Sequence, residues 1–487
     1  MRTLLIAAAL GAILALAIVL RFMGLDANPG GLYVDEAAEA LSAQRLQHLS
    51  GFPPVFFADG GGREALFAYL VAFGFGLFGE SVLVLRSVAA AIGVGAVAAI
   101  WLLGRRFGAI AALAAAAWAA GSMWLICVSR DGMRNTLVPL LGALALAALL
   151  GWERRPGRGS AALAGGVTAL ATLYTYQPLK LLPILVVVWL WWLRRTNRPA
   201  YLALHPTFGF GVVAFLAVGA PMIAAAITDP GAWFGRAAGV SLFSDAAWQL
   251  PGHWLQTLGM FAVTGDPNGR HNVDALPLLG APLTALAALG VGRLWVRRHD
   301  PAHALLLWSL PVFLLPPMLA TEGDAPHFLR ALGLAAPLAI TIGLGVATLA
   351  GWISDRWGVI AGRAVLTMAA AGLLALAVGS GWAYRTRPLA DRYDAFNYAL
   401  VAMAEAAGGK DVVILDEYSA GVVRFLDGPD GPAIVPPGAA LDPPTPGSTV
   451  LALSRTDLEV AVGPLAAGRA RAIAFDPQGR ARVWAVP

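Results

Sequence analysis

YVDEAAE, at residues 33–39, places two adjacent carboxylates a short way after the hydrophobic run MRTLLIAAALGAILALAIVLRF (1–22). That run approaches the ~20 residues that cross a bilayer, and its small-residue cleavage context is weak. We therefore expect an uncleaved first membrane span rather than a signal peptide. Carboxylates beside a membrane are costly to hold, which favours a functional site at Asp35 and Glu36. Because acids also stabilise a helix N-terminus, a capping role stays open at this point.

The composition is typical of polytopic membrane proteins. Of the 487 residues, 58% are hydrophobic and only 13% are charged, and the mean hydropathy is +0.69. Soluble globular domains do not have this composition. The net charge of +5 comes with arginines in short clusters between hydrophobic runs, which favours membrane orientation over nucleic-acid binding. The single cysteine, Cys127, rules out a disulfide within the chain.

Hydrophobic runs of roughly bilayer length predict an all-α polytopic fold with about 11 transmembrane helices. The expected spans are 4–22, 81–103, 108–127, 136–151, 160–177, 179–193, 207–227, 277–292, 302–320, 331–350 and 364–383. Arginine clusters fall in every second connection, and by the positive-inside rule that side faces the cytoplasm. The clusters are Arg105–Arg106, Arg154–Arg155 with Arg158, Arg194–Arg195 with Arg198, Arg293 with Arg297–Arg298, and Arg356 with Arg363. We therefore expect a plasma-membrane protein with a cytoplasmic N-terminus and an extracytoplasmic C-terminal tail.

The opposite side of the membrane receives five loops, of which the first, 24–80, is the most informative. Apolar residues at helical spacing in EAAEALSAQRL (36–46) predict a short helix that begins at the two acids and lies on the membrane surface. Residues 66–78 are apolar but too short to span, so they suit a second interfacial helix. The other outer loops are 129–135, 174–180, about 228–276 and 321–330.

The sequence changes character near residue 385. This change predicts a membrane domain at 1–385 and a small extracytoplasmic α/β domain at 386–487. In the second domain we expect a helix at 391–407, strands in DVVILDEYSA (411–420) and STVLALS (448–454), and a hairpin in RAIAFDPQGRARVWAVP (471–487). The Pro- and Gly-rich residues 427–447 predict a loop.

All five outer loops contain polar residues that a structural role does not easily explain. They are Asp35, Glu36, Arg63, Glu64, Arg130, Arg134, Tyr176, Lys180, Arg270, His271, His327 and Arg330. Arg and Lys at this depth suit a lipid-borne substrate, whose phosphate they would hold by charge-assisted hydrogen bonds. For any single Arg or Lys, snorkelling to lipid headgroups is the alternative, and either His could instead cap a helix.

Motifs of several other functional classes are missing from the sequence. There is no GxxxxGK[ST] loop, which argues against an ATP-driven pump, and no dinucleotide fingerprint follows a strand. Neither HExxH nor paired CxxC is present, although Glu64 with His327 leaves a divalent metal open. No cofactor is therefore firmly expected.

The first span, the external Asp35–Glu36, GREALFAYL (62–70) and LRSVAAAIGVGAVAAIWLLGRRFG (85–108) together carry a family resemblance. The chain resembles the integral membrane glycosyltransferases of the GT-C superfamily. It is most similar to the dolichyl-phosphate-mannose protein mannosyltransferase family (family 39), which includes the aminoarabinose lipid A transferases. The resemblance covers roughly residues 1–385 and is specific for the superfamily rather than for a substrate.

The resemblance implies an inverting hexosyltransferase that moves a sugar from a polyprenyl-phosphate donor to a protein, lipid or glycan on the outer face. It also implies an acid in the first outer loop that acts on the acceptor, a role carried to Asp35, with Glu36 as the alternative. Where relatives often read Lys-Pro-Pro, this chain has Glu64 followed by Ala-Leu, so that lysine's phosphate contact is not carried over. Phosphate is then expected at Arg130, Arg134 and Lys180. Such a transfer needs one base and a stabilised leaving phosphate, which these residue types supply.

Two other functional classes compete with a transferase. A secondary transporter or lipid flippase would explain charges in a membrane protein, but such proteins usually have internal repeats and midplane charges, and the sequence indicates neither. A structural or assembly protein of the cell envelope would bind partners through its outer domain. Such a protein would be insensitive to changes at Asp35 and Glu36.

Overall fold

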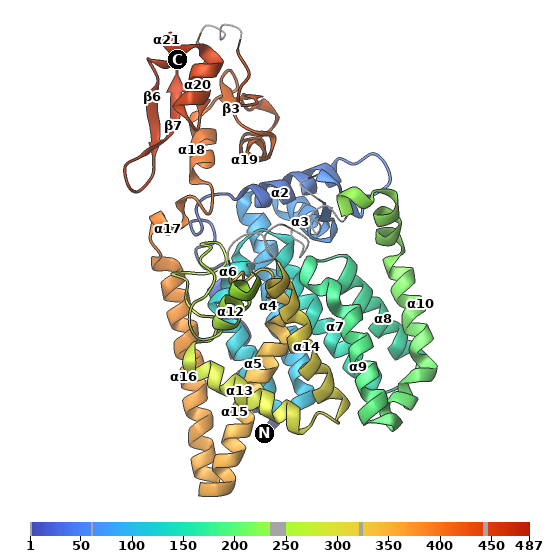
Figure 1. Cartoon of the computed structure of the whole chain (residues 1–487). Helices are drawn as coiled ribbons and strands as arrows, with labels where there is room; N and C mark the ends of the chain where they lie inside the picture. The colour runs from blue at the N-terminus through green and yellow to red at the C-terminus, as the bar shows by residue number, and fades with distance from the viewer. Residues whose placement is uncertain (1, 60–61, 234–249, 321–324, 442–446) are drawn as a thin grey trace. The chain divides into compact units, whose positions relative to one another are not determined.

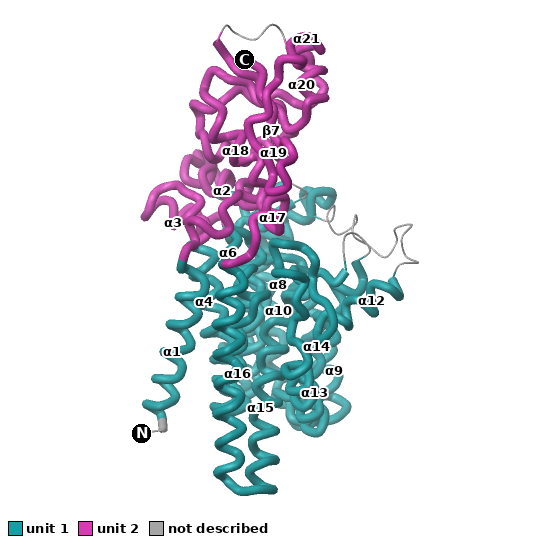
Figure 2. Tube along the Cα trace, turned by 90° about the vertical axis from the view of Figure 1, so that its left-hand side faces the viewer, with its two compact units in different colours: residues 1–23, 53–67, 87–385 teal, residues 24–52, 68–86, 386–487 magenta. Residues whose placement is uncertain are grey.

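The structure, a computed structural model, describes residues 2–59, 62–233, 250–320, 325–441 and 447–487 (Figure 1). Parts of four expected loops, at 60–61, 234–249, 321–324 and 442–446, lie outside the described residues. The chain divides into two compact units (Figure 2). Unit 1 holds residues 1–23, 53–67 and 87–385, and unit 2 holds 24–52, 68–86 and 386–487. The C-terminal residues thus share a unit with two segments of the first loop.

Long apolar helices make the chain an integral membrane protein. Eight helices of the described residues are long and apolar enough to cross a bilayer. They are Thr3–Phe22, Val82–Phe107, Arg134–Arg154, Gln177–Thr196, Arg198–Thr228, Pro301–Leu319, Leu332–Trp357 and Val359–Thr386. A ninth results if α5 (Ala109–Gly121) and α6 (Met123–Arg130), which are bent by 57°, form one broken span.

The expected count of 11 spans is not confirmed, and helix length is the reason. The predicted spans 160–177 and 277–292 correspond to α8 (Arg158–Leu173) and α13 (Gly280–Val296), which have 16 and 17 residues. At about 1.5 Å per residue, both are shorter than the ~30 Å hydrocarbon core of a bilayer. The predicted span 108–127 is the bent pair α5–α6.

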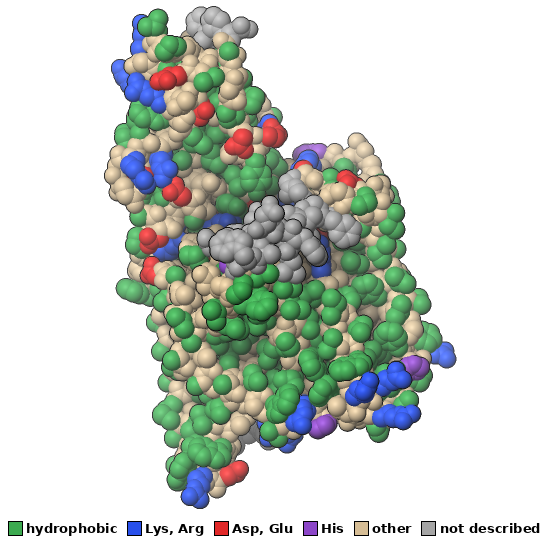
Figure 3. All heavy atoms as spheres, viewed as in Figure 1, with side chains coloured by type: hydrophobic (Ala, Val, Ile, Leu, Met, Phe, Trp, Pro, Cys, Tyr) green, Lys and Arg blue, Asp and Glu red, His purple; other side chains and the backbone are tan. Residues whose placement is uncertain are grey.

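The arginine clusters lie where one long helix ends and the next begins. The helices concerned are α4 (Val82–Gly104), α5, α7 (Leu137–Arg154), α8, α9 (Leu182–Thr196), α10 (Arg198–Thr228), α13, α14 (Pro301–Leu319), α15 (Ala335–Trp357) and α16 (Val359–Thr386). Arg106 pairs with Glu153 at 3.3 Å, and the Trp192 indole donates to the Arg298 carbonyl oxygen at 2.8 Å, so separate connections meet. Figure 3 shows Lys and Arg side chains along this end of unit 1 and hydrophobic side chains over its flank.

Glycines allow the helices of unit 1 to approach closely. A Cβ atom added at Gly165 of α8 would lie 1.9 Å from the carbonyl oxygen of Gly211 in α10. A Cβ added at Gly345 of α15 would lie 1.9 Å from the carbonyl oxygen of Leu286 in α13. Small residues at helix contacts are typical of membrane bundles, where close backbone packing replaces the hydrophobic driving force.

Unit 2 joins the first-loop helices to the C-terminal domain. The expected helices are confirmed as α2 (Val34–Gln47) and α3 (Leu66–Phe78), although their position on a membrane surface stays a prediction. Both contact α19 (Glu417–Asp427) of the C-terminal domain. A Cβ added at Gly421 would lie 3.6 Å from the Leu41 side chain, and the Phe425 ring stacks on that of Phe75 with centroids 6.1 Å apart.

The C-terminal domain contains a five-stranded mixed sheet in the order β4-β3-β5-β7-β6. Its strands are β3 (Val412–Ile414), β4 (Ala433–Val435), β5 (Val450–Ala452), β6 (Arg471–Phe475) and β7 (Ala481–Val486). Strand β3 runs parallel to β4 and β5, and β6 and β7 form the predicted antiparallel hairpin.

Three secondary-structure predictions for this domain need correction. Residues 427–447, expected to form a loop, contain strand β4, which pairs with β3 at the edge of the sheet. The strand expected over 411–420 ends at Ile414, because the Asp416 carboxylate caps α19 by accepting from the backbone N–H groups of Tyr418 and Ser419, both at 3.0 Å. The helix expected over 391–407 is two helices, α17 (Leu389–Tyr393) and α18 (Tyr398–Ala406). Between them Asn397 has a φ of +51°, a left-handed conformation that does not continue a helix.

Candidate functional site

The structure gives Glu36 a structural partner. Its carboxylate is fully buried and accepts from the Arg86 guanidinium at 2.8 and 2.9 Å. It also accepts from the backbone N–H of Tyr33 at 3.1 Å, which is half of a capping box at the start of α2. Arg86 further donates to the carbonyl oxygens of Pro29 and Gly31. Glu36 therefore fixes the head of α2 on the preceding loop, as the capping alternative predicted.

Asp35, one residue earlier, has different surroundings. Only 7% of the residue is exposed, and its carboxylate accepts a hydrogen bond from the Tyr418 hydroxyl of α19. The Val34 N–H beside it donates to the Asn397 side chain at 3.2 Å. Adjacent positions on a helix point about 100° apart, so the two acids face different neighbours. Asp35 is thus the acid of this pair that is held by a hydroxyl rather than by a cation.

Glu64, Arg134 and Lys180 come together in unit 1. Glu64 lies in β2 (Arg63–Glu64), which pairs with β1 (Phe56–Phe57), while Arg134 opens η3 (Arg134–Thr136) and Lys180 lies in η4 (Gln177–Leu181). One Glu64 oxygen is 3.2 Å from Arg134 Nε, and the other is 3.3 Å from Lys180 Nζ. The three residues bring two cations to one carboxylate, leaving a net positive charge that suits a phosphate.

Aromatic rings flank this cationic cluster. The Arg134 guanidinium lies 5.8 Å from the centre of the Tyr176 ring, and the Lys180 ammonium lies 4.6 Å from the centre of the Trp233 ring. Such rings stabilise a cation through their quadrupole. The Lys180 side chain is 23% exposed, against 4% for that of Arg134, so Lys180 is the cation that an anion can reach more easily.

Two predicted phosphate contacts have other neighbours in the structure. Arg130 is 1% exposed and donates to the carbonyl oxygens of Leu20, Arg21 and Met23, at 2.9–3.2 Å. Leu20 and Arg21 lie in the last turn of α1 (Arg2–Phe22) and Met23 follows it, and a cation at this end is stabilised by the helix dipole. Arg130 therefore caps the C-terminal end of α1, and its expected phosphate contact stays a prediction. Arg63 is 3% exposed and pairs with Asp59 at 2.7 Å.

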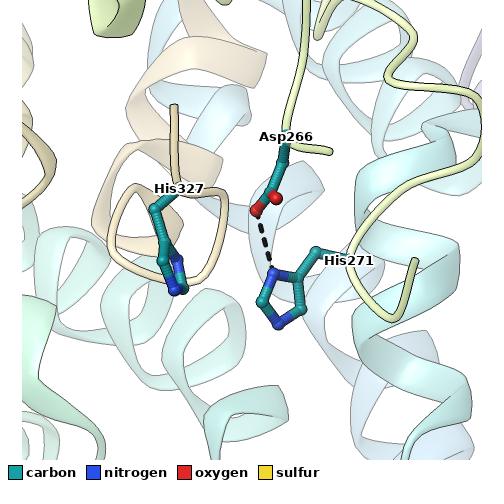
Figure 4. A group of neighbouring side chains, drawn as sticks. All are labelled: Asp266, His271 and His327. Atoms are coloured by element: carbon teal, nitrogen blue, oxygen red, sulfur yellow. Dashed lines mark hydrogen bonds and ion pairs between the residues drawn. The ribbon is translucent and has the colours of Figure 1, made fainter. Parts of the chain in front are cut away.

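A third group joins two loops of unit 1, and it includes both predicted histidines. Figure 4 shows Asp266 hydrogen-bonded to His271, with the His327 ring facing them from another loop. The distance from Asp266 Oδ2 to His271 Nδ1 is 2.9 Å, and the same oxygen accepts from the Phe328 N–H at 2.7 Å. The two imidazole centroids are 5.1 Å apart. His327 thus lies with His271 and Asp266 rather than with Glu64, whose oxygens are paired with cations.

Burial and neighbouring positive charges lower the pKa of both imidazoles. Burial lowers the pKa of His271, the Asp266 bond opposes this, and the charges of Arg270 and Arg330 add to the lowering. Burial and the neighbouring His271 lower the pKa of His327 to about 3. Burial alone would raise the pKa of Asp266, but its bond to His271 and the nearby imidazoles outweigh that and lower it. Arg270 and Arg330, both predicted site residues, therefore lie close to the histidines.

This group could hold a divalent metal. Asp266, His271 and His327 each offer one ligand atom, and these atoms lie within 4.8 Å of one another. His271 Nε2 and His327 Nδ1 are buried and lack a hydrogen-bond partner among the described residues. Neutral imidazole nitrogens with a carboxylate are typical Zn²⁺ ligands at about 2.0–2.2 Å, so the group would contract around an ion.

Sequence reasoning missed two residues of these groups. Asp266 stands in the same GDPNGRHN segment (265–272) as Arg270 and His271, and an acid five residues before a histidine was the available signal. Tyr418 belongs to the stretch expected to be a strand in a domain without recognisable motifs. Its contact with Asp35 joins positions 383 residues apart, so no local pattern indicates it.

Comparison with known proteins shows the fold. No family model matches the chain, and no curated protein matches it in sequence. The structure of ArnT from Cupriavidus metallidurans bound to undecaprenyl phosphate is similar with a TM-score of 0.63 and 14% identity, over 98% of this chain and 97% of that one. The archaeal oligosaccharyltransferase AglB from Archaeoglobus fulgidus, in complex with an inhibitory peptide and a dolichol-phosphate, has a TM-score of 0.59 and 13% identity, over 98% and 74%. The chain therefore shares the fold of these two proteins, which agrees with the fold that the resemblance to the GT-C superfamily implied.

Proposed function

From the GT-C fold, we propose that this protein is an inverting glycosyltransferase that takes its sugar from a polyprenyl-phosphate donor. The observation that carries the proposal is the cluster of Glu64, Arg134 and Lys180, two cations on one carboxylate. Its net positive charge and partly exposed lysine suit the phosphate of a lipid carrier. Two structurally similar proteins were solved with undecaprenyl phosphate and with dolichol-phosphate. A GT-C fold favours this reading over a transporter or flippase.

A polyprenyl-phosphate donor requires groups that stabilise its phosphate as the sugar leaves. In a single displacement the acceptor oxygen forms a bond to the anomeric carbon while the bond from that carbon to the phosphate oxygen breaks. Negative charge develops on the departing phosphate, which Lys180 and Arg134 would neutralise. No general acid is then required at the leaving group. We assign a hexose as the transferred sugar, following the family resemblance, and an acceptor that is a protein, a lipid or a glycan.

Asp35 is our candidate for the general base. Its carboxylate already accepts a hydrogen bond from a hydroxyl group, so it can also take the proton of an acceptor hydroxyl. Glu36 is the weaker candidate, because its carboxylate is bound to the buried Arg86 guanidinium. A base that is paired with a cation would have to break that pair before accepting a proton.

We place the protein in the plasma membrane, with the arginine-rich end of unit 1 and the N-terminus in the cytoplasm. The positive-inside rule supports this orientation. The C-terminal domain would then be extracytoplasmic, where nucleotide sugars are absent and a membrane-borne donor is needed.

The test is consumption of labelled polyprenyl-phosphate sugars by purified protein in lipid, with a membrane extract as the acceptor source. Wild type should consume one donor of the panel, and Asp35→Asn should not. Asp26→Asn is the matched control, since it makes the same change at an exposed acid of the same loop and should stay active. Equal consumption by wild type and Asp35→Asn would refute the base assignment. No consumption of any donor by wild type would count against the transferase itself.

A further inference from the structure

The hydroxyl of Tyr418 occupies the carboxylate that we assign as the base. It donates to Asp35 Oδ1, and both residues belong to unit 2. An acceptor hydroxyl giving its proton to Asp35 would have to approach the carboxylate with the same donor geometry. A water molecule would also donate an O–H to this oxygen. Tyr418 therefore occupies the hydrogen-bonding position on Asp35 that an acceptor hydroxyl or a water molecule would take.

Local structure fixes the position of this tyrosine. Strand β3 ends at Ile414, and Asp416 then caps α19, which places Tyr418 in the first turn of that helix. Asp35 lies in the first turn of α2, so the two side chains meet where two helices begin. The contacts of α19 with Leu41 of α2 and Phe75 of α3 hold α19 against both helices.

The two partners differ in exposure, and this difference decides which of the two side chains can move away from the other. Asp35 is 7% exposed, whereas Tyr418 is 44% exposed. A buried acid on a packed helix keeps its place, but a half-exposed phenol can rotate about its side-chain bonds without opening a core. Displacement of the phenol therefore costs far less than displacement of the acid.

We propose that Tyr418 covers Asp35 until an acceptor hydroxyl displaces it, and so limits the loss of donor to water. The inference rests on the proposed transferase function and adds a residue that discriminates acceptor from water. In the side reaction, a water oxygen would bond to the anomeric carbon, the bond to the phosphate would break, and the water proton would pass to Asp35. With the phenol in place, water does not reach that carboxylate oxygen.

The C-terminal domain acquires a role from this contact. Through α19 this domain supplies the Tyr418 hydroxyl that covers Asp35. The rest of its interface holds the start of α2. Other contacts of the same interface are structural: the Gly30 N–H donates to the Tyr398 hydroxyl at 2.9 Å, and Arg392 donates to the Asn28 side chain at 2.7 Å. Tyr398 thus offers a matched control, a phenol that joins the same parts of unit 2 without touching Asp35.

Two measurements on full-length protein in lipid test the proposal, with Tyr418→Phe as the variant and Tyr398→Phe as its control. The first needs no turnover: labelling of Asp35 by a carbodiimide and an amine, followed by peptide mass spectrometry. Removing the covering hydroxyl should speed labelling in Tyr418→Phe and leave Tyr398→Phe like wild type. The second is release of free sugar from the donor without acceptor. It should rise by about tenfold in Tyr418→Phe, the factor set by one hydrogen bond to a charged group.

Each outcome decides a different claim. Faster labelling with faster hydrolysis supports the covering role. Unchanged labelling in Tyr418→Phe overturns it, because the hydroxyl then does not shield the carboxylate. Faster labelling with reduced transfer and no gain in hydrolysis also overturns it, because Tyr418 would then only orient Asp35. If labelling rises but no protein consumes any donor, the transferase function fails and the covering role fails with it, although the contact stands.

Discussion

The substitution Glu36→Gln tests whether Glu36, unlike the adjacent Asp35, stabilises the fold. The readout is the stability of the protein rather than its activity. The substitution keeps the size of the side chain and removes its charge. In the native protein Glu36 and Arg86 are 0% and 1% exposed and are joined by two hydrogen bonds, at 2.8 and 2.9 Å. Arg86 cannot lose its proton, so the variant buries a guanidinium beside a neutral amide. Arg86 would keep its hydrogen bonds to the carbonyl oxygens of Pro29 and Gly31.

The magnitude follows from the burial of both partners. Breaking a buried ion pair by removing one partner costs about 3–5 kcal/mol. We expect the lower end, about 3 kcal/mol, because glutamine still offers one acceptor oxygen to Arg86. That energy corresponds to about a hundredfold change in the equilibrium for opening α2. Asp35→Asn should cost less than about 1 kcal/mol, because asparagine keeps an oxygen for the Tyr418 hydroxyl and leaves the ion pair intact.

Hydrogen exchange of the peptide covering Val34–Gln47, followed by mass spectrometry in detergent, measures this opening directly. Protection should fall about a hundredfold in Glu36→Gln and little in Asp35→Asn. The double variant Glu36→Leu/Arg86→Leu should recover much of the loss, since apolar residues often replace a buried pair at small cost. Equal protection in the two single variants would refute the division of roles between the acids.

Three further predictions concern other groups. Lys180→Ala should weaken the binding of polyprenyl phosphate to the purified protein by about tenfold or more through the loss of a charge-assisted bond, while Arg158→Ala, at the arginine-rich end, should leave it unchanged. Zn²⁺ binding measured by equilibrium dialysis should be lost in His271→Ala but kept in His303→Ala; equal binding would exclude the three-residue group as a metal site. Asp416→Ala should lower stability by about 1 kcal/mol through loss of the α19 cap. Burial raises the pKa of Asp416 but its bonds to the start of α19 lower it overall, so this contribution is present above pH 3.8 and should vanish on acidification through the lowered pKa, as thermal unfolding against pH would show.

Hydrophobic pattern predicted the helices of unit 1 well and their number poorly. Length explains the difference for α8 and α13, because an apolar run does not reveal where its helix ends. The break between α5 and α6 had a local signal, since Gly121 and Ser122 stand at the bend and such pairs favour kinks. The shared end of the arginine clusters was predictable, because it follows from the count of connections.

The candidate site was predictable in its residue types and not in its pairings. Charge and placement singled out Glu64, Arg134 and Lys180, and the structure brings them together from three segments. The sequence could not divide Asp35 from Glu36, because the division depends on Arg86 and Tyr418, which reach the two acids only in the fold. These pairings are tertiary contacts, and no periodicity in the chain encodes them.

The order of synthesis determines when each contact within unit 2 can form. Glu36 and Arg86 are 50 residues apart, and Asp35 and Tyr418 are 383 apart. At about 5–20 residues per second, the ribosome supplies Arg86 within about 3–10 s of Glu36, but Tyr418 only about 20–80 s after Asp35. The ion pair at the N-terminus of α2 can thus form early. Asp35, by contrast, has no Tyr418 contact until α19, in the last fifth of the chain, has been synthesised. A nascent or truncated protein without α19 would lack the Tyr418 hydroxyl on Asp35, the residue that we propose as the base.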